Sequence, residues 1–130
     1  MGASGKSAIS ATRHLLALAT LVAGCATERA YEGPPRPAGE VATVRADPVV
    51  SAGLPVQTRI RSVDGREVGI SASKVALPPG RHVLLVDCRM AESGSVRRFT
   101  VEAELDAGRR YRLEAQTSAR NCEAVRLIDD

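Results

Sequence analysis

The sequence predicts an all-β protein, a small β-sandwich or a partly closed barrel of about seven short strands. Short runs of β-branched and apolar residues alternate with turn residues from residue 40 to residue 130. These runs recur at the spacing of about eight to twelve residues that is typical of sandwiches and barrels. No helical periodicity appears after Cys25. The stretch of roughly ninety residues suffices for one small domain.

Each expected strand is bounded by turn residues. The ranges are 41–45, 56–63, 68–72, 81–88, 96–105, 109–115 and 122–128. Asp64-Gly65-Arg66 joins the second range to the third. Because Asp-Gly favours a two-residue turn, these two strands should form a hairpin.

The clearest strand is 96–105, where apolar and polar residues alternate with period two. One face should hold Phe99, Val101, Ala103 and Leu105, and the other Thr100, Glu102 and Glu104. The same alternation in 109–115 should point Tyr111, Leu113 and Ala115 inward. Half-buried strands of this kind need a second layer, which favours a sandwich or a barrel.

The amino-terminal residues have the organisation of an export signal. Lys6 and Arg13 precede an apolar run from Leu15 to Val22, which is shorter than the roughly 20 residues that a permanent membrane helix needs. Val22-Ala23-Gly24-Cys25 resembles the lipobox of bacterial lipoproteins. This resemblance implies that residues 1–24 are removed as a signal peptide and that Cys25 carries diacylglycerol and an N-acyl chain. An ordinary secretory signal or a signal anchor are the alternatives.

The residue after the cysteine bears on localisation. Ala26 follows Cys25, whereas in enterobacteria-like lipoproteins an aspartate there implies retention in the inner membrane. The resemblance therefore implies an outer-membrane lipoprotein that faces the periplasm, with the inner membrane or the cell surface as alternatives. Two or three acyl chains hold a protein in a bilayer essentially permanently.

Residues 25–39 should be a lipidated terminus followed by a tether. The letters from Thr27 to Gly39, "TERAYEGPPRPAG", include three prolines and two glycines. Proline-rich stretches favour extended polyproline II, which would hold the domain at residues 40–130 some tens of ångströms from the lipid. The alternative is that Tyr31 and Pro34-Pro35 dock on the domain as a first irregular strand.

Two glycine turns followed by strands carry a second resemblance. The letters "LPPGRHVLLV" and "LDAGRRYRLEA" resemble turn-strand units of small PEGA-like surface modules. Small lipoproteins of Gram-negative envelopes have a similar Tyr-x-Gly-Pro segment after the lipid cysteine, as Tyr31-Glu32-Gly33-Pro34 is here. The resemblance covers about half of the mature chain and implies a fold without implying an activity.

The charge balance argues against nucleic acid as a partner. The full chain has 18 basic and 15 acidic residues, and removal of Lys6 and Arg13 with the signal leaves 16 basic residues. Binding to a phosphate backbone needs a clustered excess of positive charge. A nearly neutral mature chain makes nucleic-acid binding a poor interpretation.

Cys88 and Cys122 remain once Cys25 is lipidated. An even pair of cysteines in a small exported domain is typically bridged. Cys88 ends one expected strand in phase with Leu84 and Val86, and Cys122 opens the last strand. We therefore expect a disulfide between strand ends, with two buried free thiols as the alternative.

No residue pattern indicates catalysis, a metal or a cofactor. His82 is the only histidine after residue 24, and a lone histidine in a strand is more often structural than catalytic. The sequence has no Gly-x-Ser-x-Gly elbow, no phosphate-binding loop and no dinucleotide fingerprint. Two cysteines and one histidine at unrelated spacings do not form a zinc set. The expectation is a protein that is not an enzyme.

Arginines supply the remaining candidate site, a possible anionic-ligand surface. It consists of Arg97, Arg98, Arg109, Arg110 and Arg112 on two adjacent expected strands. Arg59 and Arg61 alternate on the exposed face of another expected strand. Guanidinium groups match phosphates and carboxylates of lipid headgroups, lipopolysaccharide or peptidoglycan. The alternative is a solvated face, on which Glu102, Glu104 and Glu114 provide partners of opposite charge.

Two functions from different classes follow from these features. The first is a lipid-anchored, non-catalytic interaction or assembly module with a protein partner in the cell envelope. The second is a binder of anionic cell-wall or lipopolysaccharide groups through the arginine-rich face. An exposed apolar strand edge would favour the first function, and arginines clustered without carboxylate partners would favour the second.

Overall fold

The computed structural model describes residue 2 and residues 27–47, 56–70 and 72–130. Nine strands and one 3₁₀ helix lie within these ranges. They are β1 (Thr27–Arg29), η1 (Ala38–Glu40), β2 (Ala42–Arg45), β3 (Val56–Val63), β4 (Arg66–Glu67), β5 (Lys74–Leu77), β6 (Gly80–Met90), β7 (Val96–Leu105), β8 (Arg110–Ser118) and β9 (Asn121–Asp129). Residues 1 and 3–26, which hold the expected signal and the lipobox, lie outside the described residues.

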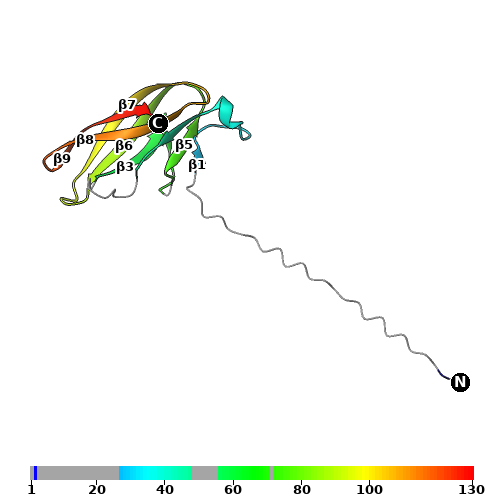
Figure 1. The fold of residues 1–130 in the computed structure, drawn as a ribbon, viewed down its shortest axis with the longest axis horizontal. Coiled ribbons are helices and arrows are strands. Elements are labelled where there is room, and N and C mark those ends of the chain that lie inside the picture. The colour runs from blue at the N-terminus through cyan, green and yellow to red at the C-terminus, as the bar shows by residue number, and fades with distance from the viewer. Residues whose placement is uncertain (1, 3–26, 48–55, 71) are drawn as a thin grey trace.

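The strands form two sheets that stack as a β-sandwich (Figure 1). One sheet has five strands in the order β1-β5-β2-β8-β9, and the other has four in the order β4-β3-β6-β7. The sheets do not close into a barrel, so of the two architectures that the sequence allowed, the sandwich is the one observed. The predicted all-β class is confirmed.

Both inner faces supply the apolar core, and the predicted faces are confirmed. Val101, Ala103 and Leu105 of β7 are buried, while the alternate residues of that strand are exposed. Tyr111 and Leu113 of β8 are buried in the opposite sheet. Alternation places every second residue of a strand on the same face, which explains why the pattern could be read from the sequence.

The first hairpin is shorter than expected. β3 pairs with β4 through Ser62↔Glu67 and Val63↔Arg66. Asp64 and Gly65 both have positive φ, at 50° and 81°, as the favoured two-residue hairpin turn requires. The turn is thus confirmed. The predicted second strand at 68–72 is wrong, because the strand consists of only Arg66 and Glu67.

The sequence pattern also missed β5. Its residues Val75, Ala76 and Leu77 are all buried, so the run lacks the alternation of a half-buried strand. Two prolines follow it directly, and these made the whole segment resemble a turn. β5 nevertheless pairs with β2 on one side and with β1 on the other.

Part of the expected tether is docked on the domain. β1 pairs in parallel with β5 through Thr27↔Lys74, Glu28↔Val75 and Arg29↔Ala76. The Ala30 amide continues this pairing by donating to the Ala76 carbonyl at 3.0 Å. The docked strand is Thr27–Arg29, whereas the residues that the docking alternative named lie outside any strand: Tyr31 is half-buried, and Pro34 and Pro35 are exposed.

A buried threonine joins the two sheets where β2 ends. The side-chain oxygen of Thr58 in β3 accepts a hydrogen bond from the Asp47 amide at 2.9 Å, and the Thr58 amide donates to the Asp47 carbonyl at 2.8 Å. Thr58 is therefore a buried polar residue whose hydroxyl has a partner. This contact sets the end of β2 beside the start of β3.

Candidate functional site

The predicted disulfide is confirmed. Cys88 of β6 and Cys122 of β9 are bonded, with their Cα atoms 6.3 Å apart. Because β6 and β9 belong to different sheets, the bond ties the two layers together. Both cysteines are buried in the core cluster.

The structure separates the five candidate arginines. Arg97 and Arg98 lie on β7 in the four-stranded sheet, while Arg110 and Arg112 lie on β8 in the five-stranded sheet, and Arg109 directly precedes β8. The chain changes sheets between β7 and β8. Strands that follow each other in the sequence are therefore not neighbours in a sheet here, and the five residues do not form one patch.

Most of these arginines have partners within the fold. Arg97 donates to the Cys122 carbonyl at 2.8 Å, and its guanidinium lies 5.4 Å from the centroid of the Phe99 ring. The Arg98 Nε atom donates to the Asp87 Oδ1 atom at 2.8 Å. This hydrogen bond, together with the charge of Asp87, raises the pKa of Arg98.

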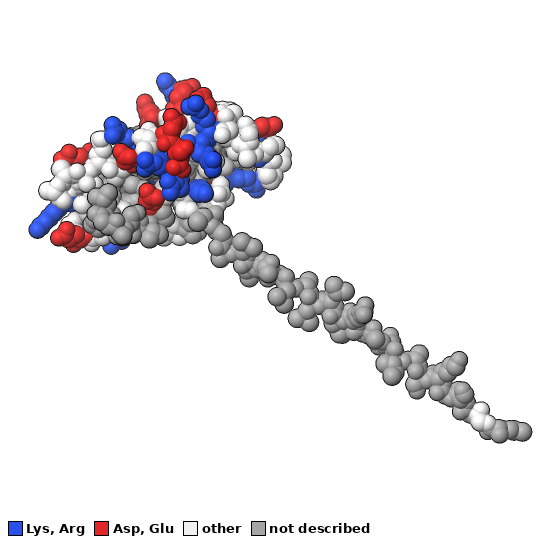
Figure 2. All heavy atoms as spheres, viewed as in Figure 1, with Lys and Arg blue, Asp and Glu red and all other residues white. Residues whose placement is uncertain are grey.

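The β8 arginines differ from one another. Arg109 lies 3.7 Å from Asp129, and Arg112 lies 3.6 Å from Glu114 and 3.9 Å from Asp130. Arg110 forms no ion pair with any residue that the structure describes. Basic and acidic side chains stand next to each other on the face that Figure 2 displays. Ion pairs on the surface contribute little to stability, and their balanced charge weakens attraction for an external anion.

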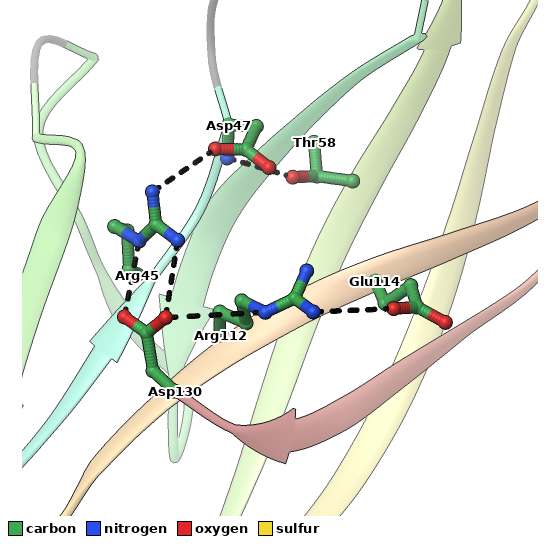
Figure 3. Close-up of polar contacts among 6 residues, drawn as sticks. All are labelled: Arg45, Asp47, Thr58, Arg112, Glu114 and Asp130. Carbon is green, nitrogen blue, oxygen red and sulfur yellow. Dashed lines mark hydrogen bonds and ion pairs between the residues drawn. The ribbon is translucent and has the colours of Figure 1, made fainter. Parts of the chain in front are cut away.

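An alternating series of arginines and carboxylates crosses the five-stranded sheet (Figure 3). Arg45 of β2 holds Asp130 through two hydrogen bonds, Nε–Oδ2 at 3.3 Å and Nη2–Oδ1 at 3.2 Å. Arg112 joins the same carboxylate to Glu114. Sequence reasoning missed Arg45 and Asp130, which are far apart in the chain and meet because β8 pairs with β2 on one side and with β9 on the other.

A hollow of about 340 Å³ lies beside this network. Its lining combines apolar side chains with charges of both signs: Asp47, Val56, Thr58, Arg112, Leu113, Glu114, Ala115 and Thr117. The lining carries two carboxylates, Asp47 and Glu114, and one guanidinium, Arg112, which is already paired with Glu114.

His82 joins two turns. Its Nδ1 atom lies 2.6 Å from the Asp64 Oδ2 atom, and its Nε2 atom lies 2.6 Å from the Pro78 carbonyl. The Asp64 carboxylate also accepts from the Val83 amide at 2.8 Å. The imidazole thus links the β3–β4 turn to the β5–β6 connection, which is a structural arrangement.

This contact predicts acid sensitivity. Burial raises the pKa of Asp64, but the hydrogen bond with His82, the Val83 amide and the charge of His82 outweigh it, so that this pKa lies below its ordinary value of 3.8. A carboxyl with a lowered pKa contributes stability above the unfolded value, and this contribution is lost as the pH falls through the folded value.

As the pH falls from about 5 to about 2, the free energy of unfolding of Asp64→Asn should therefore decrease less steeply than that of the wild type. Asparagine tolerates the positive φ of 50° at this position, so the variant changes the charge and keeps the turn. Urea titrations of both proteins across this pH range measure the difference. Equal slopes for the two proteins would contradict the assignment.

The described residues contain neither a metal-binding cluster nor a membrane-spanning helix. Among them, no group of three or more histidine, cysteine, aspartate or glutamate side chains is placed to hold a metal ion. No helix within the same ranges is long and apolar enough to cross a membrane.

The fold and its contacts define a class: a two-sheet β-sandwich with a disulfide between its layers and ion-paired outer faces. No family model, curated protein or solved structure matches the chain. Its function must therefore be argued from its own residues.

Proposed function

We propose that this protein is a lipid-anchored domain of the bacterial cell envelope that acts as a non-catalytic interaction or assembly module. The observation that carries the proposal is the Cys88–Cys122 disulfide between the sheets. Structural disulfides persist in oxidising compartments such as the periplasm and are rare in the cytosol. An exported domain agrees with the amino-terminal charge, apolar run and lipobox-like residues.

The position of β1 sets how close to the membrane an anchor at Cys25 would hold the domain. β1 begins at Thr27, so only Ala26 separates Cys25 from the sheet. Diacylglycerol and an N-acyl chain on Cys25 would hold the sandwich at the membrane surface, because about 0.8 kcal/mol is gained for each buried methylene. The proposed location is the periplasmic face of the outer membrane, and the proposed partner is an envelope protein.

Replacing Cys25 by serine tests this anchor. In cells that are fed a clickable fatty acid, the wild type should become labelled and should be found in the membrane fraction. Cys25→Ser should be unlabelled and absent from the membrane fraction, because serine has no thiol to receive the lipid. The matched control is Cys88→Ala with Cys122→Ala, which should keep the label. Label retained by Cys25→Ser would refute the anchor.

The ion pairs favour a protein partner over the five-arginine anion surface. Arg98, Arg109 and Arg112 already contact carboxylates, and Arg97 donates to a backbone carbonyl. An external anion would have to displace these partners. Crosslinking in intact cells, followed by purification through the domain, would identify the partner. Recovery of lipopolysaccharide or cell-wall fragments without any protein would refute the proposal that the domain binds a protein partner.

A further inference from the structure

A second hollow, of about 280 Å³, lies on the four-stranded sheet. Its lining is Gln57, Arg59, Ile70, Asp87, Arg89 and Val96. Two rows of paired residues form its floor, Gln57↔Arg89↔Val96 and Arg59↔Asp87↔Arg98. The rows come from β3, β6 and β7, so the hydrogen-bonded sheet fixes the spacing of these side chains.

Basic groups outnumber acidic groups at this hollow. The carboxylate of Asp87, only 14% exposed, already lies 2.8 Å from Arg98 and 3.5 Å from Arg61. Arg59 and Arg89 form no ion pair with any described residue, although Arg59 is directly opposite Asp87. The other carboxylates of this sheet lie further along the strands, opposite Ser62, Val83 and Arg81: Glu67, Glu102 and Glu104.

One of these arginines has an unfulfilled hydrogen bond. The Nε atom of Arg59 is buried and has no acceptor among the residues that the structure describes. Buried donors in folded proteins nearly always have a partner. Arg59 lines a hollow with surplus positive charge, so this donor is available to an anionic ligand.

The rim of the hollow is apolar. Ile70 is 76% exposed and Val96 is 55% exposed, and both belong to the small group of large exposed apolar side chains in the described chain. Side chains of this kind next to a charged site favour a ligand that carries an apolar portion beside its anionic group. A free inorganic ion would leave this rim in water.

The hollow lies at the end of the sandwich where β1 begins. Thr27 is in register with Lys74, and Lys74 with Arg45. Asp47, which is two residues after Arg45, contacts Thr58 near the start of β3. The neighbours of Thr58 in the chain are Gln57 and Arg59, which line the hollow. On the rim, the Gly69 amide, adjacent to Ile70, donates to the Glu28 carboxylate of β1 at 2.7 Å. The hollow thus lies at the end of the sandwich where β1 begins at Thr27, which is two residues after Cys25 in the sequence.

We infer that this hollow binds the anionic headgroup of a phospholipid in the membrane that holds the protein. The guanidinium groups of Arg59 and Arg89 contact the phosphate, and Ile70 and Val96 contact the adjoining apolar part of the lipid. The statement that this lipid comes from the membrane that holds the protein rests on the proposed anchor at Cys25. The recognition itself rests only on the charge, the unpaired donor and the apolar rim.

Native mass spectrometry of the mature protein, purified from cell membranes, tests this site. The protein is transferred to detergent micelles doped with either phosphatidylglycerol or phosphatidylcholine. We expect one phosphatidylglycerol to stay bound and phosphatidylcholine to be lost. Arg89→Gln and Arg59→Gln should each weaken retention about tenfold, the usual loss when a charge-assisted hydrogen bond is removed. Ile70→Ser should weaken it several-fold.

Arg81→Gln is the matched control. Arg81 lies on the same strand as Arg89 but at its other end, where it is paired with Glu104, and its replacement should leave lipid retention unchanged. Arg89 and Ile70 are exposed, so their variants keep the test valid even where Arg59→Gln fails to fold.

Three outcomes would overturn the inference. They are equal retention of the two lipids, retention that survives Arg89→Gln, and full displacement of phosphatidylglycerol by inorganic phosphate that itself binds without lipid. The same spectra report the acyl mass on Cys25 separately. A chain without that mass that still selects phosphatidylglycerol would refute the anchor and support the headgroup site.

Discussion

Replacing Cys88 and Cys122 together by alanine is expected to lower the free energy of unfolding by roughly 3 to 4 kcal/mol. The bond closes a loop with a sequence separation of 34 residues, and its loss would free the unfolded chain to adopt more conformations. Such a loss is a large share of the roughly 5 to 15 kcal/mol that stabilises a typical domain.

This domain has reason to depend on its disulfide. Aromatic residues make up only 2% of the chain and tryptophan is absent, so the core consists mainly of valine, leucine and alanine. Such side chains bury less apolar area each than aromatic rings do. The bond also joins the two layers directly, which the backbone hydrogen bonds within each sheet do not do.

Thermal and urea denaturation of the variant and of the wild type, with and without reductant, measure the effect. Reductant should lower the melting temperature of the wild type by many degrees and leave the double variant unchanged. Ready alkylation of both thiols in the native, unreduced wild type would contradict the bond. An unchanged midpoint in the double variant would contradict its energetic role.

Leu84→Ala should have an effect of similar size, about 2 to 5 kcal/mol. Leu84 is fully buried on β6, where Val63 of β3 and Val101 of β7 lie opposite it in the sheet. Alanine would remove the apolar contacts and leave a cavity that flanking strands cannot close, because they are held in register by backbone hydrogen bonds.

Val83→Ala provides the matched control. Val83 is the next residue along the same strand, but it is 41% exposed on the outer face. Its truncation should change the stability by less than about 1 kcal/mol. Urea denaturation midpoints of the two variants measure the difference. Similar losses for both would show that strand propensity, and not core packing, determines the stability of β6.

The sequence predicted those elements in which local rules act alone. Alternation in 96–105 identified the inner face of β7, and Asp64-Gly65 identified the first hairpin turn. The disulfide followed from two cysteines at strand ends in a chain that the sequence predicts to be exported. Each of these predictions needed only neighbouring residues or a count of residues.

The features that the sequence did not reveal depend on pairing between distant strands. β1 and β5 are short, and each is stabilised by its neighbour more than by its own pattern. The arginines of β7 and β8 look contiguous in the chain, yet the passage of the chain between the sheets separates them. Arg59 and Arg89 came together through the pairing of β3 with β6, and no local signal marks that register.

The docking of β1 has a mechanical consequence for an anchored protein. If Cys25 holds the lipid, any pull on the domain passes through β1, whose three pairs with β5 lie at the edge of the sheet. These pairs bear the load before the core does. Once they separate, the 13 residues from Thr27 to Gly39 can span about 40 Å in all when fully extended. The sandwich of a lipid-anchored protein would then move away from the bilayer while its disulfide-linked layers stay folded.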